Sequence, residues 1–185
     1  MLVSTDYFTK WVKAEPLANI RDVDAKRFVW RNIVTRFEVP RTLISDNELQ
    51  FDSKAFRRYC YELGIANRYS TPAYPGNEQA KTSNKVIVNG LKKRLDDAKG
   101  RWLEELPHVL WAYRTMPRWS TGETPFAMTD GAEAIILLEA NFPMLKTNSF
   151  TPSGNDELLG ESLDLIEERR ERATIHLAYY HQKLK

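Results

Sequence analysis

The stretch LISDNELQFDSKAFRRYCYELGI, residues 43–65, decides the fold. The segment VPRTLISDN, which includes the start of this stretch, contains a short apolar run that ends at Asp46. This run predicts a β-strand with a carboxylate at its C-terminal end. The segment DSKAFRRYCYELGI then predicts a helix, with Asp52 or Ser53 as its N-cap and Gly64 closing it. Strand, loop and helix in this order are typical of α/β proteins.

The flanking segments predict further strands and helices. Upstream, LVSTDYFTKWVKAEPL is rich in β-branched and aromatic residues, which predicts two short strands on either side of residues 7–10. DVDAKRFVWRNIVTRF predicts a helix with Asp22 as its N-cap, and IANRYST predicts a strand that stops at Pro72. Downstream, residues 78–98 and RWLEELPHVLWAYRT predict two helices, the second broken or kinked at Pro107, whereas PRWSTGETPFAMTDG predicts a loop.

The last part of the chain, residues 155–185, is charged and predicts an amphipathic helix behind a linker over residues 140–154. Its apolar positions alternate steps of four and three and form a heptad seam of Leu159, Leu163, Ile166, Arg170, Ala173, Leu177, Tyr180 and Leu184. Arg170 interrupts this seam and argues against a strong coiled coil. The segment is therefore expected to be a connecting helix or a dimer seam. The order of elements predicts an α/β layer protein with a mixed sheet.

The composition predicts a soluble intracellular protein, nuclear or cytoplasmic. Hydrophobic residues make up 42% of the chain, and the net charge of +2 neither requires nor excludes nucleic acid as a partner. Cys60, the sole cysteine, allows no internal disulfide and is expected to be buried in a helix. No signal peptide or membrane-spanning run is visible. The tryptophans expected in the core are Trp11, Trp30, Trp102 and Trp111.

Two aspartates are candidate ligands of a divalent cation. Asp6 lies on or just after the first predicted strand, and Asp46 lies at the C-terminal end of a later one. Two carboxylates that converge at strand ends can hold Mg²⁺, which prefers oxygen ligands. The alternative is plain turn chemistry, because Asp-Asn pairs such as Asp46–Asn47 are common in turns.

Four segments together resemble the integrase catalytic core of plant gypsy-type LTR retrotransposons. They are DYFTKWVKAEPL, LISDNELQFDSKAFRRYCYELGI, RYSTPAYPGNEQAKTSNK and LPHVLWAYRTMPRWSTGETPF. The resemblance implies an RNase H-like fold over residues 1–139, with a mixed five-stranded sheet flanked by helices. It also implies Mg²⁺- or Mn²⁺-dependent 3′-end processing and strand transfer of DNA. The family's catalytic triad is Asp, Asp, Glu, and its first two acids carry over to Asp6 and Asp46.

The third acid does not carry over. In PGNEQAK one residue is missing after Pro75, and Lys81 occupies the position of the family's glutamate. A lysine there removes a ligand and puts a cation beside the metal site, so catalysis is expected to be impaired and metal binding weakened. Glu78 lies one helical turn earlier and is a candidate substitute. Glu48 replaces a glycine of the family's turn, which is expected to cost about 1 kcal/mol if that turn needs a positive φ.

The candidate DNA-binding residues follow this loop. By resemblance, Lys85 and its neighbour Asn84 are expected to contact a DNA end, and Lys92 continues the basic face. Tyr74 is a candidate for stacking on an unpaired base. The alternative for the lysines is a solvated helix face, and for Tyr74 packing within its loop.

Two functions of different classes remain open at this stage. The first is an integrase core that acts on DNA with impaired catalysis. Its expected partners are the element ends and the target DNA. The second is an RNase H-like module that binds nucleic acid, or assembles as a homo-oligomer, without catalysis. A fragment without a cellular role is a third interpretation.

Overall fold

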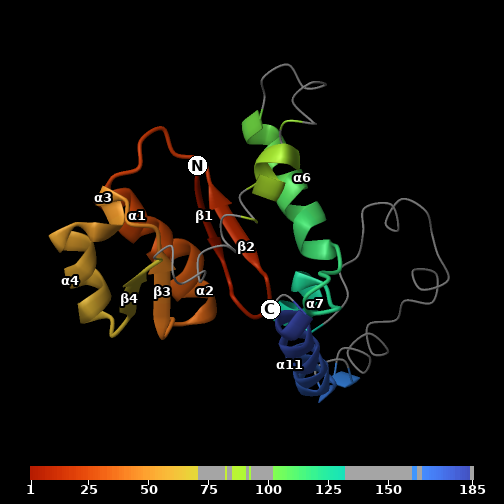
Figure 1. Ribbon diagram of the computed structural model, residues 1–185. Coiled ribbons are helices and arrows are strands. Elements are labelled where there is room, and N and C mark those ends of the chain that lie inside the picture. The colour runs from red at the N-terminus through yellow and green to blue at the C-terminus, as the bar shows by residue number, and fades with distance from the viewer. Residues whose placement is uncertain are drawn as a thin grey trace. The chain divides into compact units, whose positions relative to one another are not determined.

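The computed structural model describes residues 1–70, 82, 85–90, 92, 102–131, 160–161 and 164–183 (Figure 1). The chain divides into two compact units. The first unit comprises Met1–Thr5 and Val12–Pro107, and the second comprises Asp6–Trp11 and His108–Lys185. The predicted boundaries at residues 139 and 154 lie outside the described residues.

The first unit begins with an antiparallel strand pair, β1 (Leu2–Thr5) and β2 (Val12–Glu15). The register pairs Leu2 with Glu15 and Thr5 with Val12. Val12 is fully buried, as expected of an aliphatic residue on the inner face of a pair. The prediction of two short strands around residues 7–10 is confirmed.

A helical region follows, made of α1 (Asp22–Val29), a π-helical turn η1 (Trp30–Val34) and α2 (Thr35–Phe37). The predicted N-cap, Asp22, is wrong by one residue, since Arg21 occupies that position. The reason lies in Asp24, whose Oδ2 accepts hydrogen bonds from the Arg21 backbone N–H (3.2 Å) and Nε (3.0 Å). These bonds fix the start of the helix at Asp22.

The π-helical turn changes which side chains are buried. A π turn holds more residues than an α turn, so an apolar face read with the α-helical period does not continue through it. Trp30, at its start, is 48% exposed, and Phe37 beyond it is 44% exposed. The prediction that Trp30 belongs to the core is therefore wrong.

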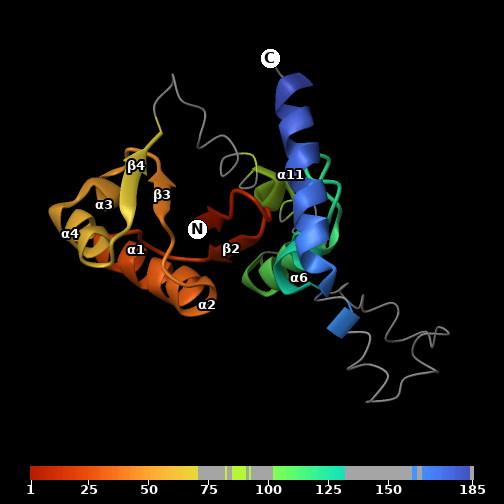
Figure 2. The ribbon, with the colours of Figure 1, turned by 90° about the horizontal axis from the view of Figure 1, so that it is seen from below.

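Strand β3 (Thr42–Ser45), helices α3 (Leu49–Asp52) and α4 (Lys54–Glu62), and strand β4 (Ala66–Tyr69) complete the described secondary structure up to residue 70 (Figure 2). β3 and β4 are parallel. Ser53, one of the two predicted caps, accepts a hydrogen bond from the Phe56 backbone N–H at 3.0 Å. Gly64 has φ +71° and ends α4, as predicted. The short α3 was not predicted.

The core of the first unit lies between α1, α4 and the segment that leads into β4. Its buried residues are Ala25, Val29, Phe56, Cys60 and Ile65, with Ile33, Val34, Leu43, Phe51, Tyr59 and Leu63 packed around them. The thiol of Cys60 is 1% exposed, so the prediction of a buried helical cysteine is confirmed. Burial also raises the pKa of this thiol.

The strands described make two separate two-stranded sheets, one antiparallel and one parallel. The predicted α/β class with both strand directions is therefore observed, while the predicted set of five strands is not seen in the described residues. A parallel pair connected through helices is the βαβ unit expected of this class.

The second unit contains the hairpin turn of residues 6–11 and helices α7 (Pro125–Asp130) and α11 (Ile166–Lys183). Helix α6 (Trp102–Thr115) runs through Pro107 as one helix, so of the two predicted alternatives the break is wrong and the kink stays a prediction. Proline removes the bond to the carbonyl four residues earlier, here that of Leu103. Leu103 is 55% exposed, so this part of the helix lies near water.

Helix α7 corrects another prediction, because residues 125–130 were expected to be loop. The Thr124 hydroxyl accepts a hydrogen bond from the Ala127 backbone N–H at 3.0 Å, and Pro125 takes the first helical position. Gly131, with φ +77°, closes the helix. Both ends of this short helix are therefore fixed by local chemistry.

Helix α11 packs on α7 through part of the predicted heptad seam. Ala173 is fully buried and Leu177 is 9% exposed, whereas Tyr180 is 37% exposed. Arg170 directs its Nη2 to the Met128 carbonyl at 3.5 Å. Ala173 and Leu177 are thus buried within the chain, which favours an intramolecular role for that part of the seam. Leu159, Leu163 and Leu184 lie outside the described residues.

Candidate metal site and nucleic-acid interface

Asp46 lies where the parallel strands end. It follows Ser45, the last residue of β3, and is half-buried. Ser45 is paired with Tyr69 in β4, and its carbonyl accepts a hydrogen bond from the Ser70 N–H at 2.9 Å. The predicted position of Asp46 at a strand C-terminus is confirmed. This edge of a parallel sheet is where α/β proteins commonly bind ligands.

Glu48, two residues further, is not strained. Its backbone is extended, with φ −76° and ψ 149°, and it forms the N-cap position of α3. The condition for the expected cost, a positive φ, is therefore not met. The loop accepts glutamate at this position without the glycine of the family's turn.

Asp6 lies directly after β1, as predicted, in the tight turn that joins β1 to β2. Its Oδ1 accepts hydrogen bonds from the Thr9 backbone N–H and from the Thr9 hydroxyl, both at 2.7 Å. Its backbone N–H donates to the Trp11 carbonyl at 2.8 Å. The carboxylate thus caps an Asx-type turn, a structural role that aspartate commonly has.

Lys10, at the end of the same turn, has an unusual backbone conformation and a buried side chain. Its φ is +62°, its side chain is largely buried, and its Nζ donates to the Tyr7 carbonyl at 2.6 Å. Nζ also lies 4.7 Å from the centre of the Tyr7 ring. Burial lowers the pKa of Lys10 to about 8, although the charge of Asp6 acts in the opposite direction.

The two acids belong to different units, so each is defined only by its own surroundings. Among the described residues, His, Cys, Asp and Glu side chains form no group of three that could hold a metal ion. Glu78 and Lys81, on which the third position depends, lie outside those residues.

The predicted DNA-binding residues fall partly within the structure. Lys85 and Lys92 are helical and exposed, and Ile87, also helical, is fully buried. Exposure suits phosphate contacts and a solvated face equally. Asn84 and Tyr74 lie outside the described residues.

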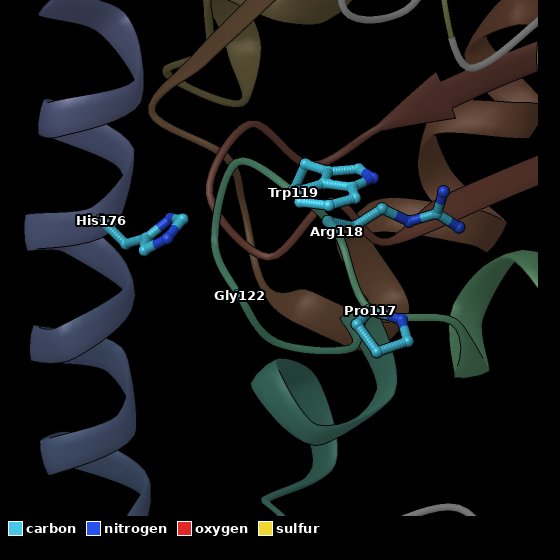
Figure 3. A pocket seen from close by; sticks show the side chains of 5 residues that line it. All are labelled: Pro117, Arg118, Trp119, Gly122 and His176. Carbon is cyan, nitrogen blue, oxygen red and sulfur yellow. The ribbon is translucent and has the colours of Figure 1, made fainter.

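Sequence reasoning missed a pocket in the second unit (Figure 3). It has a volume of about 420 Å³ and is lined by Pro117, Arg118, Trp119, Gly122 and His176. The guanidinium of Arg118 donates to the Tyr113 carbonyl and lies 3.5 Å from the centre of the Tyr113 ring. Burial lowers the pKa of Arg118. The available signal was Trp119, whose neighbours in the sequence are polar or basic.

The fold and the strand-end aspartate define the class to which the chain is similar. Residues 1–75 match the family model of the integrase core domain. The integrase catalytic core of HTLV-2, solved in complex with magnesium in a dimeric form, superposes with a TM-score of 0.54 at 20% identity. That match covers 67% of this chain and 79% of the solved one. An RNase H-like fold is thereby supported, and the predicted resemblance to an integrase core is confirmed.

Two of the similar proteins are a viral and an animal protein. The Gag-Pol polyprotein of feline leukemia virus is 29% identical over 100% of this chain, and gypsy retrotransposon integrase-like protein 1 of Bos taurus is 23% identical over 84%. The chain spans 10% and 28% of the lengths of these two proteins. An origin in a plant is not shown by these matches. Searching the described residues for a helix long and apolar enough to cross a membrane finds none.

Proposed function

We propose that the chain is a retrotransposon-type integrase core domain that binds DNA, and that its metal-dependent 3′-end processing and strand transfer are impaired. The observation that carries the proposal is the integrase-core match over residues 1–75, together with Asp46 at the C-terminal end of a parallel strand pair. Such a protein would act inside the cell, in the nucleus when it integrates DNA. Element ends and target DNA would be its partners.

The proposed metal ligands are Asp46 and Asp6, which supply the oxygen donors that Mg²⁺ and Mn²⁺ prefer. Divalent cations supply activation of the attacking oxygen and stabilisation of the leaving oxygen in phosphodiester chemistry. The donor set fits weak binding at most. Oδ1 of Asp6 is engaged by Thr9, and Lys81 stands where the family's third acid is expected. The proposal therefore rests more on Asp46 than on Asp6.

The proposed DNA contacts are Lys85, Lys92 and Asn84, with Tyr74 as a stacking residue. The exposure of Lys85 and Lys92 supports this assignment. Lysine contacts to phosphate give affinity without sequence reading and weaken as salt is raised.

A second candidate function is a module that binds nucleic acid or assembles into homo-oligomers without catalysis. Lys81 in place of an acid favours it. The HTLV-2 core was solved in a dimeric form, which supports testing oligomerisation here.

A strand-transfer assay with purified protein and Mn²⁺ tests the proposed function. We expect weak or absent activity in the native chain and a gain on Lys81→Glu, because the substitution restores a carboxylate. The matched control is Lys54→Glu, which makes the same change of charge at an exposed lysine that is neither a proposed ligand nor a proposed DNA contact. Full activity in the native chain that is lost in Glu78→Gln would instead show that Glu78 has replaced the missing acid.

Metal titration separates the roles of the two aspartates. Asp46→Asn is expected to abolish Mn²⁺ binding. Asp6→Asn retains an oxygen acceptor for Thr9 and should preserve the turn, whereas Asp6→Ala should destabilise it. If Asp6→Asn folds normally but loses Mn²⁺, Asp6 is a ligand; if it keeps Mn²⁺, its role is the turn. DNA binding that is indifferent to Mn²⁺ and to Asp46→Asn would favour the non-catalytic module.

A further inference from the structure

Two segments far apart in the sequence form the pocket of the second unit. The loop between α6 and α7 supplies Pro117, Arg118, Trp119 and Gly122, and α11 supplies His176. The His176 ring extends from α11 toward this loop, and its Nδ1 lies 3.3 Å from the Ser120 carbonyl (Figure 3). The loop and the helix are thus held together beside Trp119.

Trp119 has no packing role that explains it. Its side chain is 91% exposed, the highest value among the large hydrophobic residues described. Tryptophan is normally well buried, so an indole left in water beside a pocket indicates contact with a ligand or partner. The guanidinium of neighbouring Arg118 is directed to Tyr113, which leaves the indole as the main recognition group of this loop.

The part of α11 around His176 supplies the chemistry beside this pocket. Residues 172–180 contain the basic residues Arg172 and His176 and no acidic residue, and Arg172 lies 3.8 Å from Glu168 one turn earlier. Tyr179 and Tyr180, 56% and 37% exposed, lie three and four positions after His176 and hence on the same side of the helix. Cations interleaved with aromatic rings are complementary to the phosphates and bases of a single nucleic-acid strand. Helix-dipole preference alone explains basic residues at a helix end but not the exposed rings.

We propose that Trp119 is a stacking platform for an unpaired base of single-stranded DNA, with His176 at the edge of the base and the strand running along residues 172–180. This inference deepens the proposed function and rests on it. The pocket volume of about 420 Å³ is within the size range of small-ligand sites. The absence of acidic residues from residues 172–180 favours a polyanion over a proline-rich peptide, the other ligand that an exposed indole accommodates.

Fluorescence anisotropy of labelled DNA with the full chain tests the proposal. The probes are a short oligothymidine strand, the same strand with abasic sites, and a blunt duplex of equal length. Trp119→Ala is expected to weaken oligothymidine binding about tenfold, as loss of one stacked base does. Trp119→Phe should retain most of the affinity, and His176→Ala should lose a few-fold. Tyr61→Ala is the matched control, because Tyr61 is an 86% exposed aromatic residue in the first unit.

Specificity for the base gives the decisive comparison. If Trp119 stacks on a base, Trp119→Ala should leave binding of the abasic strand and the duplex unchanged. The proposal would be overturned if Trp119→Ala lost as much affinity for abasic DNA as for oligothymidine, or lost none for oligothymidine. It would also be overturned if the chain bound a proline-rich peptide through Trp119 and did not bind DNA. If the native chain binds neither duplex nor single strand, the proposed function itself fails. If it binds the duplex but Trp119→Ala changes nothing, only this inference fails.

Discussion

Glu38 has a backbone conformation that normally requires glycine. Its φ is +67° and its ψ is −176°, directly after α2 ends at Phe37. A side chain in this region costs about 1–3 kcal/mol, because Cβ collides with the neighbouring backbone. The strain is therefore located at the exit of the first helical region, where the chain turns toward β3.

Replacing Glu38 with glycine should stabilise the protein. The relief of strain exceeds the greater entropy that glycine gains in the unfolded chain, so we expect a net gain of about 1 kcal/mol. Urea denaturation of the full chain measures it. Glu48→Gly is the matched control, since Glu48 has an ordinary φ of −76° and should gain nothing. Equal effects of the two substitutions would contradict the assignment of strain to Glu38.

Lys10 makes stability depend on pH in the alkaline range. Its pKa is lowered to about 8 in the folded chain from 10.5, so between these values the unfolded chain binds more protons than the folded one. Stability contributed by this residue should therefore rise as pH increases from about 8 to 10.5. Denaturation across this range measures the unfolding free energy of the native chain and of Lys10→Gly. The value for the native chain minus that for the variant should rise with pH. A constant difference would show that Lys10 does not titrate abnormally.

At the scale of single elements, Ser53 separates α3 from α4. Its hydroxyl satisfies the Phe56 backbone N–H, one of the donors left without a partner at a helix start. Ser53→Ala should cost about 1 kcal/mol of unfolding free energy, while Ser53→Asp should retain stability because it keeps the acceptor. Chemical denaturation checks both. If both variants lose the same amount, the cap bond is not what stabilises α4.

Sequence patterns predicted those elements whose signals are long or unambiguous. β1, β2, β3 and β4 follow from β-branched, aromatic and apolar residues, and α4 follows from its cap at Ser53 and its closing Gly64. Helix α7 was missed although Thr124, Pro125 and Gly131 mark its ends, because six residues are too few to show a helical period. The exposure of Trp30 was missed because a π turn breaks the α-helical period in a way that the sequence does not reveal.

The candidate site was predictable to the same extent as its local structure. Asp46 was placed correctly because one strand and its end decide its position. The turn role of Asp6 was not predicted, since an Asx turn depends on the partner Thr9 and not on aspartate alone. The pocket at Trp119 was not predictable, because it requires contact between Ser120 and His176, 56 residues apart.

For the whole molecule, a net charge of +2 gives little long-range attraction for DNA, so binding should depend on a few local cations. Each lysine–phosphate contact to a duplex contributes about 0.9 to the slope of log affinity against log salt concentration. The Lys85→Ala/Lys92→Ala double variant should therefore reduce the magnitude of this slope by about 1.8. A salt titration of duplex binding measures this slope. Lys54→Ala, which removes an exposed lysine of α4, is the control and should leave it unchanged. An unaltered slope in the double variant would assign both lysines to a solvated helix face.

Buried Cys60 makes the first unit open to kinetic measurement. The chain has one cysteine, which is 1% exposed in the core formed with Ala25, Val29 and Phe56. A thiol reagent can reach it only when α4 separates from that core, so its rate of modification reports how often the first unit opens. No labelling site needs to be engineered. The native chain thus carries its own reporter for the opening of the first unit.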